Sequence, residues 1–334
     1  MNKGKIGREG LVKKFAPVET EVVPTGIIPL DLVLGGGFPK GVFIEMASPS
    51  GLGKSTIMAH VAKNFCAKGK RVDWLDFEHA LTPGLKDGIG LTGYEKDGLF
   101  THFDPVTYGD AEEILEGMGD EKPDMVVIDS ESAMLPDSAI DVSIVDTQAL
   151  GLKARVSAAF LNKFKGWAKR GGTTIVFINQ MRVKFETRGR TMMAFEDSAG
   201  GNAFKFYMDI RLRLRRTGDL TREEDTIEGK KKVIYGVEAA IWALKNRNVR
   251  SHIELTAPII FGRGVSNNMV IKNILIRAGV VSSAGSYFKI NMGNVYEGTV
   301  MGNKGLNQFI KENKEAIEKY IADNDLMFLV RTEQ

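Results

Sequence analysis

Residues 42–65, VFIEMASPSGLGKSTIMAHVAKNF, decide the fold of this chain. They predict an apolar strand over 42–46, a glycine-rich turn, and a helix with Ile57, Met58, Val61, Ala62 and Phe65 on one face. The turn ends in Gly51-Leu52-Gly53-Lys54-Ser55-Thr56, the pattern of a phosphate-binding loop between a strand and a helix. A chance glycine-rich turn is the alternative, and the flanking strand and helix argue against it.

The turn has the chemistry of a nucleotide site. Backbone N–H groups from Gly51 to Ser55 can surround a β-phosphate at the positive end of the helix. Lys54 adds a charge for the β- and γ-phosphates, and the Ser55 hydroxyl is a candidate Mg²⁺ ligand. The motif's first glycine is replaced by Ser48, which Pro49 follows. The nucleotide contacts expected in the loop are Ser50, Gly51, Leu52, Gly53, Lys54, Ser55 and Thr56.

Length and composition bound the class of protein. With 334 residues, 43% of them hydrophobic and 26% charged, the chain predicts one large globular domain with small appendages. Cys66 is the only cysteine, so no disulfide forms within the chain, which fits a reducing cytosol and a cytoplasmic location. The N-terminus lacks a signal-peptide core and no apolar run reaches spanning length, so we expect no membrane contact. The net charge of +3 does not by itself indicate nucleic acid, but local basic clusters at 211–216, 230–232 and 245–250 favour it.

Apolar strands alternate with helices after the phosphate loop. The strands are expected over 71–77, 124–130 and 173–179, and they are apolar almost throughout. Such strands are typical of a mostly parallel sheet covered by helices on both faces, the doubly wound α/β class.

Polar residues follow these strands where each one ends. Glu78, Asp129 and Gln180 fall at the carboxyl ends, where sheets of this class bind ligands. Asp129 closes a Walker B-like element and is the second candidate Mg²⁺ ligand. Glu131 lies nearby, and an acid just past a strand is more often a cap or a solvated group. The convergence of these residues on the phosphate loop predicts an NTPase.

The second half of the chain is less regular. Residues between Gln180 and Gly200 show little periodicity and predict a long functional loop. Residues 210–215 then alternate apolar and Arg, which puts Arg211, Arg213 and Arg215 on one strand face. A solvated sheet edge and a functional face are both open interpretations of this arginine ladder. Two more strands are expected over 233–244 and 252–260, and a final amphipathic helix over 304–322.

From about residue 19 to 322 the chain resembles the RecA-type recombinases of bacteria and phages. The resemblance rests on motifs in the family's order: Thr25-Gly26, Leu30-Asp31, Leu34-Gly35-Gly36-Gly37, Asp76-Phe77-Glu78-His79-Ala80-Leu81, Phe177-Ile178-Asn179-Gln180-Met181-Arg182, Gly200-Gly201-Asn202-Ala203-Phe204-Lys205-Phe206-Tyr207 and Lys245-Asn246-Arg247. It implies three parts. They are a protomer-contact segment over 1–24, an ATPase core over 25–265, and a small α/β domain over 266–334.

The resemblance also implies catalytic roles. Glu78 matches the family's catalytic glutamate, which activates the attacking water, and Lys54 is its phosphate-loop lysine. Gln180 matches the glutamine that senses the γ-phosphate and signals to the DNA loop after it. Lys245 and Arg247 match paired cations that reach the next protomer's nucleotide, with Arg in place of the commoner Lys.

Two DNA-binding loops are implied, over about 140–151 and 182–201. Leu150 and Phe185 fall at the positions whose side chains wedge between base triplets of the bound strand. Arg155, Arg182, Lys184 and Arg215 would bind phosphates, and Gly200, Gly201 and Asn202 would offer backbone N–H groups.

The chain departs from the family at several positions. Leu85 occupies the place of the adenine-stacking tyrosine, so we expect Phe261 and Gly262 of the adjoining subunit to contribute to base recognition. Ala240 and Trp242 replace a basic pair of the second DNA site, for which the lysines at 230–232 are candidate substitutes. The acidic C-terminal tail of bacterial members is absent and the N-terminal segment is short. These departures indicate a divergent, phage-encoded member.

The resemblance therefore implies an ATP- and Mg²⁺-dependent recombinase. Such a protein forms a head-to-tail helical filament on single-stranded DNA, hydrolyses ATP when DNA is bound, and exchanges strands with a homologous duplex. Two alternatives remain at this point: another RecA-fold DNA motor, such as a ring helicase or a clock-type ATPase, and a DNA-coating filament protein without significant turnover. Intact Lys54, Glu78 and Asp129 argue against the second.

Overall fold

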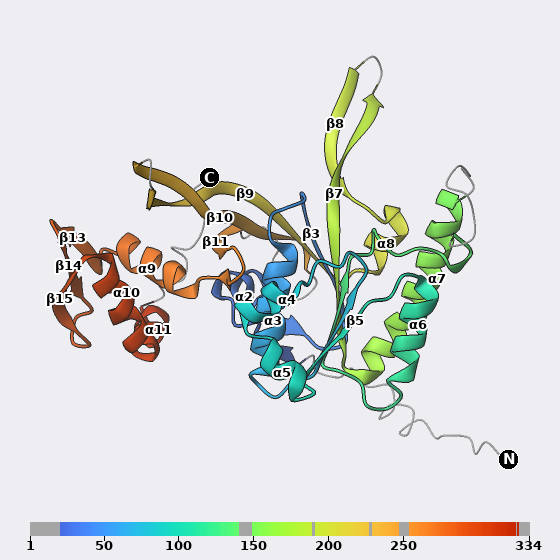
Figure 1. Ribbon diagram of the computed structural model, residues 1–334, viewed down its shortest axis with the longest axis horizontal. Coiled ribbons are helices and arrows are strands. Elements are labelled where there is room, and N and C mark those ends of the chain that lie inside the picture. The colour runs from blue at the N-terminus through green and yellow to red at the C-terminus, as the bar shows by residue number, and fades with distance from the viewer. Residues whose placement is uncertain are drawn as a thin grey trace.

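The structure is a computed structural model that describes residues 21–139, 149–188, 191–226, 229–246, 254–324 and 326. Within these residues a ten-stranded sheet has the order β12-β11-β10-β9-β3-β7-β6-β4-β5, and β8 pairs with β7 (Figure 1). Its strands are β3 (Phe43–Ser48), β4 (Val72–Asp76), β5 (Phe100–Phe103), β6 (Met125–Asp129), β7 (Thr174–Arg188), β8 (Thr191–Ser198), β9 (Ile210–Thr226), β10 (Gly229–Asn246), β11 (Glu254–Ile260) and β12 (Gly264–Val265).

The centre of the sheet is parallel, as the apolar runs predict. Strand β3 pairs in parallel with β7 and β9, and β6 pairs in parallel with β7 and β4. Every residue of β3, β4 and β6 is buried. Strands β10, β11 and β12 continue the sheet in antiparallel fashion. The predicted α/β class with a mostly parallel core is therefore confirmed.

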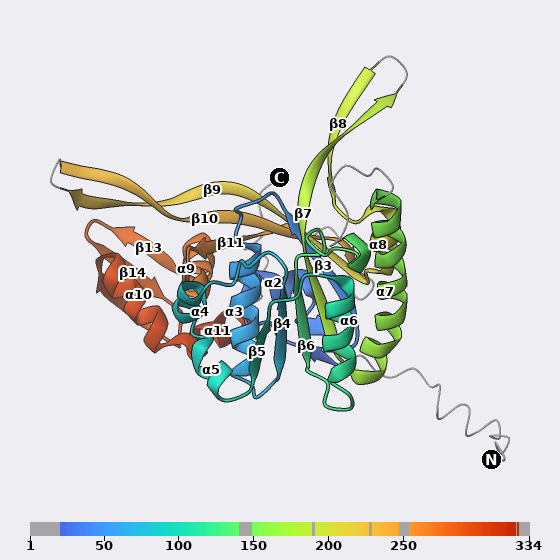
Figure 2. The same ribbon diagram turned by 45° about the vertical axis from the view of Figure 1, so that its right-hand side comes forward.

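Helices cover both faces of the parallel strands (Figure 2). Helix α3 (Lys54–Cys66) lies on one face, and α6 (Tyr108–Gly117) and α7 (Ala149–Gly171) lie on the other. Neighbouring residues of β3 show this division, because Ile44 packs in the cluster that contains α3 and Phe43 in the cluster that contains α6 and α7. Short helices α2 (Ile28–Leu34), α4 (Pro83–Ile89), α5 (Thr92–Lys96) and α8 (Gly201–Tyr207) and the strand pair β1 (Val22–Val23) and β2 (Phe38–Pro39) complete the core.

The expectation of an irregular loop after Gln180 is wrong. Strand β7 continues to Arg188 and pairs with β8 in register from Met181–Ser198 to Arg188–Thr191, forming a hairpin that projects from the body (Figure 1). The hydrogen bonds of this hairpin join backbone groups. They therefore do not require a regular pattern of apolar side chains in the sequence. Strands β9 and β10 form a second long hairpin (Figure 2).

The C-terminal part combines helices with a three-stranded antiparallel sheet. Its elements are α9 (Asn267–Arg277), β13 (Val281–Ala284), β14 (Tyr287–Asn291), β15 (Glu297–Met301), α10 (Gly302–Glu312) and α11 (Lys314–Asp323). The single helix expected over 304–322 is two helices that meet at Asn313. The Asn313 amide Nδ2 donates to the Phe309 carbonyl at 2.9 Å, so its side chain competes with the helix backbone at the break.

Candidate nucleotide-binding and catalytic site

A cavity of about 270 Å³ opens at the carboxyl ends of the parallel strands. Most of the residues predicted for nucleotide binding and catalysis meet there. The lining residues are Ser50, Gly51, Gly53, Lys54, Ser55, Thr56, Glu78, Ala80, Leu85, Asp129, Gln180 and Phe261. Leu52 is not among them, because its side chain is buried in the core cluster on the α3 side of the sheet.

The loop before α3 has the backbone that phosphate binding requires. Gly51 and Gly53 have φ values of 74° and 84°, in the left-handed region that favours glycine. Ser48 has no positive φ, so the loss of a glycine at this position leaves the turn intact. The Ser48 hydroxyl instead donates to the Pro49 carbonyl at 2.7 Å.

Lys54 lies against the inside of this loop. Its Nζ donates to the carbonyls of Ser48 and Pro49 at 3.3 and 3.1 Å and to the Ser48 hydroxyl at 3.2 Å. Burial lowers the pKa of Lys54, while the charges of Asp129 and Glu78 oppose that shift. The ammonium group is thus held beside the loop by neutral oxygens that a more strongly accepting phosphate can replace.

Ser55 and Asp129 form the oxygen pair predicted to hold Mg²⁺. The Ser55 hydroxyl donates to Asp129 Oδ2 at 2.6 Å. The pKa of Asp129 is raised to about 7, chiefly by burial and also by the nearby charges of Asp76 and Glu78, against the lowering effect of the Ser55 hydrogen bond and the Lys54 charge. A bound cation would stabilise the ionised carboxylate in this acidic surrounding, so the donor set fits Mg²⁺.

Glu78 is positioned by two side-chain donors. The Ser130 hydroxyl donates to Glu78 Oε1, and the Gln180 amide donates to both carboxylate oxygens at 3.0 and 3.3 Å. The backbone N–H of Glu78 also donates to the Asp129 carbonyl at 3.1 Å. The sequence analysis did not predict a role for Ser130. Its place directly after Asp129, at the end of a strand, could have indicated that it belongs to the site.

The prediction that Glu131 is a cap or a solvated acid is wrong. Its side chain is only 2% exposed. Oxygen Oε1 accepts from the Tyr108 hydroxyl at 3.1 Å and from the Ser157 hydroxyl at 3.2 Å, while Oε2 has no hydrogen-bond partner among the described residues. Tyr108 and Ser157 belong to α6 and α7, so these helices enclose a carboxylate that local sequence places at a surface turn.

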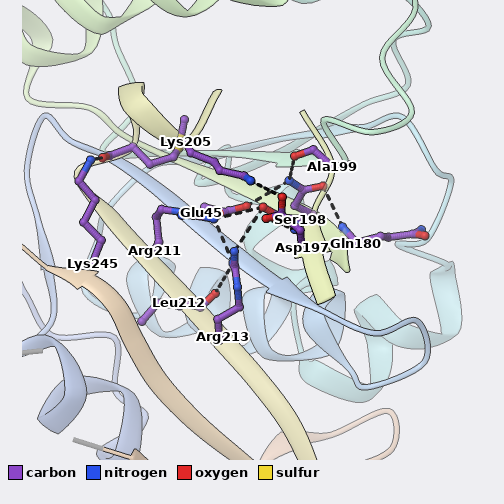
Figure 3. A network of polar contacts seen from close by, with 12 residues as sticks. Glu45, Gln180, Asp197, Ser198, Ala199, Lys205, Arg211, Leu212, Arg213 and Lys245 are labelled. Carbon is purple, nitrogen blue, oxygen red and sulfur yellow. Dashed lines mark hydrogen bonds and ion pairs between the residues drawn. The ribbon is translucent and has the colours of Figure 1, made fainter. Parts of the chain in front are cut away.

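A second polar cluster surrounds Glu45, a fully buried residue of β3 (Figure 3). Glu45 Oε2 lies 2.5 Å from Arg211 Nε and 3.2 Å from an Arg213 guanidinium nitrogen. Arg213 is 4% exposed, and burial lowers its pKa despite the opposing charge of Glu45. The solvated-edge interpretation of the arginine ladder is therefore wrong for these arginines, because β9 lies inside the sheet beside β3.

Hydrogen bonds connect this cluster with the base of the β7–β8 hairpin. The Asn179 amide donates to Glu45 Oε1 at 3.2 Å and to the Ala199 carbonyl at 3.0 Å. The Ala199 N–H donates to the Gln180 carbonyl at 3.2 Å, and the Ser198 hydroxyl accepts from Arg211 and Arg213 (Figure 3). Gln180, whose side chain contacts Glu78, is thus part of the base of the hairpin.

The predicted DNA-binding residues lie on the hairpin, on α7 and α8, and on β9. Arg182 is exposed at the start of the hairpin, where Lys184 and Phe185 are in register with Phe195 and Ala194. Gly200 caps α8 with a φ of 92°, and Gly201 and Asn202 begin that helix. Leu150 lies in the first turn of α7 and Arg155 is exposed one turn later. Arg215 on β9 forms an ion pair with Glu254 at 2.9 Å.

Some of the predicted segments and residues lie outside the described residues. These are the N-terminal segment up to residue 20, most of the first DNA loop (140–148), and Arg247. Lys245 is described, and its Nζ donates to the Met208 carbonyl at 2.5 Å. The lysines at 230–232 lie in register with Glu223, Glu224 and Asp225 across the second hairpin, so acidic neighbours face these candidate substitutes for the second DNA site.

Phe261 lines the cavity of its own chain, contrary to the expectation that it comes from an adjoining subunit. Leu85 lines the same cavity. The turn after Phe261 approaches α4 so closely that a Cβ at Gly88 would lie 2.3 Å from the Gly262 carbonyl oxygen. This close approach of turn and helix accompanies the presence of Phe261 and Leu85 in one cavity, which their distance in sequence does not reveal.

None of the described helices combines the length and the apolar composition needed to span a bilayer.

Residues 2–266 match the family model for the RecA N-terminal domain. Protein RecA of Caulobacter sp. (strain K31) is 32% identical over 313 residues, which cover 93% of this chain and 81% of the relative. The RecA proteins of Gluconobacter oxydans and Rippkaea orientalis are 30% and 33% identical over 94% and 89% of this chain, and over 85% and 80% of their own lengths. Nothing in these matches supports the expected phage origin.

Proposed function

The chain belongs to the RecA family and is an ATP-dependent recombinase, and from this premise we propose the finer features of its reaction. It forms a head-to-tail filament on single-stranded DNA, hydrolyses ATP with Mg²⁺ when that strand is bound, and pairs the strand with a homologous duplex. The observation that carries the proposal is the direct contact of Glu78 with Gln180, which joins the nucleotide cavity to the base of the projecting hairpin.

The phosphate loop binds the nucleotide in this proposal. Backbone N–H groups around Gly51 and Gly53 and the N-terminus of α3 surround the phosphates, and Lys54 exchanges its loop oxygens for phosphate oxygens. Leu85 and Phe261 provide an apolar end of the cavity for the base. Ser55 and Asp129 hold Mg²⁺, which would supply positive charge against the charge that develops on the transferred phosphoryl group.

Glu78 acts on the attacking water. Its carboxylate accepts the proton of the water as a general base, and the donors Ser130 and Gln180 fix its orientation. The cavity gives room for a water at the strand ends, where Glu78 and Lys54 both lie. Lys245 and Arg247 act on the nucleotide of the next protomer, as the family resemblance implies.

The hairpin couples DNA to hydrolysis. Gln180 shares its backbone with β7 and is hydrogen-bonded to Ala199, so a shift of the hairpin on DNA moves the amide that contacts Glu78. We propose Leu150 and Phe185 as base wedges, Arg155, Arg182, Lys184 and Arg215 as phosphate contacts, and Gly200, Gly201 and Asn202 as backbone donors. For Arg215 this requires the guanidinium to leave Glu254 or to bind with its remaining donors.

An ATPase assay with and without single-stranded DNA tests the proposal, paired with electron microscopy of the same samples. We expect hydrolysis to rise when the DNA is added and open helical filaments to form. Closed rings would instead favour a ring motor, and filaments without any hydrolysis would favour a DNA-coating protein.

A further inference from the structure

Histidine and aspartate side chains gather beside the catalytic segment, outside the nucleotide cavity. Asp76 ends β4, His102 lies in β5, and Asp104 follows β5 directly. The two strands pair in parallel with Trp74 opposite His102 and Leu75 opposite Phe103, so Asp76 and Asp104 come level at the strand ends. Because side chains two apart share one strand face, Asp76, His102 and Asp104 project on the same side of the sheet.

The separations from His102 Nε2 to the two carboxylates are close to those of ligands around one small cation. His102 Nε2 lies 3.3 Å from Asp76 Oδ2 and 3.6 Å from Asp104 Oδ1, and the three ligand atoms lie within 4.8 Å of one another. Tetrahedral ligands at about 2.0–2.1 Å from a metal ion are separated from each other by about 3.3–3.4 Å. His79 Nδ1 lies 3.4 Å from Asp104 Oδ1, so a fourth donor is adjacent.

The two carboxylates of this cluster compete for one ring nitrogen of His102. A neutral imidazole carries one N–H, and two carboxylates face the same Nε2. Among the described residues, Asp76 and Asp104 form ion pairs with histidines and with no Lys or Arg. A cation between the three side chains would interact with both carboxylates and with the imidazole nitrogen.

Asp76 is also oriented as metal-binding carboxylates are. Its side chain is 1% exposed, and its oxygens accept from the backbone N–H groups of Ala80 and Leu81 at 3.0 and 2.9 Å. Such outer hydrogen bonds fix a carboxylate for coordination. The mixed nitrogen and oxygen donors favour a first-row transition ion over Mg²⁺, which prefers oxygen ligands alone.

We propose that Asp76, His102 and Asp104 form a binding site for a divalent transition-metal ion such as Zn²⁺, with His79 as an adjacent fourth donor. Its ligands differ from the Ser55–Asp129 pair, although Asp76 lies opposite Asp129 in the paired strands β4 and β6. An ion held there braces the segment that contains Glu78, since Asp76 binds the backbone at 80–81 and His79 directly follows Glu78. With the metal bound, we expect slower ATP hydrolysis. This expected effect on turnover rests on the proposed function.

Binding of Co²⁺ to the untagged full-length chain, without ATP or DNA and with millimolar Mg²⁺ present, tests the site. We expect one Co²⁺ per chain with the visible absorption of a nitrogen–oxygen site, and binding at least about tenfold weaker in Asp104→Asn and His102→Gln. Asp104 is 62% exposed, so its replacement leaves the fold intact, which circular dichroism checks. Asp129→Asn is the matched control and should retain Co²⁺.

Absence of Co²⁺ binding at micromolar concentration would overturn the proposal. Unchanged binding in Asp104→Asn and His102→Gln would do the same, as would loss of binding in Asp129→Asn. The measurement requires neither ATP hydrolysis nor DNA, so its failure is distinct from failure of the proposed recombinase mechanism. Zn²⁺ should then slow ATP hydrolysis by the wild type and leave that of Asp104→Asn unchanged.

Discussion

The amide of Gln180 donates to both carboxylate oxygens of Glu78, although 102 positions separate the two residues in the chain. Glu78 follows β4 and Gln180 lies in β7, and β6 is the strand between them in the sheet. The two side chains meet because parallel strands place their carboxyl ends at one edge. This contact connects the residue proposed to activate water with the hairpin proposed to bind DNA.

Glu78→Gln should bind ATP normally and hydrolyse it about 10²–10⁴-fold more slowly, since the amide keeps the shape of the side chain but does not accept the proton. Nucleotide titration and phosphate release measure the two properties separately. Ser130→Ala is the companion variant and should slow hydrolysis less, because the carboxylate remains and loses only one of its donors. Near wild-type turnover by Glu78→Gln would remove Glu78 from the catalytic step.

Asp129 should make the stability of the nucleotide-free protein depend on pH. Its folded-state pKa of about 7 lies above the ordinary 3.8, so the folded protein binds the extra proton and loses stability as pH rises from about 4 to 7. Asp129→Asn removes this penalty. Thermal unfolding should therefore show the variant to be more stable than the wild type at pH 8, by on the order of 4 kcal/mol, with the difference vanishing near pH 4.

The same variant separates stability from function. Asp129→Asn should bind Mg²⁺–ATP poorly at every pH, because the amide carries no charge for the cation. A variant less stable than the wild type at pH 8 would show that the buried carboxylate is compensated in the free protein.

Glu45→Gln should cost about 3–5 kcal/mol of stability, because it leaves the buried Arg213 without its closest charge partner. The exposed pair of Arg222 and Glu224, at 2.6 Å, offers a matched control. Glu224→Gln should cost no more than about 1 kcal/mol. Denaturant unfolding of both variants measures the contrast, and equal costs would show that the Glu45 cluster is not a stabilising core feature.

Mixing two inactive variants tests whether the active site is shared between protomers. Lys54→Ala disables a protomer's own phosphate loop, whereas Arg247→Ala removes a cation proposed to act on a neighbour. In an open head-to-tail polymer of equal parts, roughly a quarter of the interfaces pair an intact loop with an intact cation, so ATP hydrolysis should reappear. If co-assembled mixtures hydrolyse no more ATP than the separate variants, Arg247 does not act across the interface.

Local sequence was sufficient for much of the core. The phosphate loop, the parallel strands before Glu78, Asp129 and Gln180, and the placement of these residues at one sheet edge follow from periodicity and from short motifs. It was insufficient for the hairpin after Gln180 and for the break at Asn313. In both places backbone hydrogen bonding or a side-chain contact with the backbone decides the conformation, and neither changes the pattern of apolar residues.

The sequence by itself determined which chemistry is present at the strand ends, because a phosphate loop and a strand-closing carboxylate are encoded within a few neighbouring residues. Only the tertiary structure decided which polar groups are buried and with whom. Glu131 is enclosed by two helices, Arg213 lies beside Glu45 inside the sheet, and Phe261 meets Leu85 in one cavity. Each of these depends on the order of strands and the packing of helices, which bring together residues that are distant in the chain.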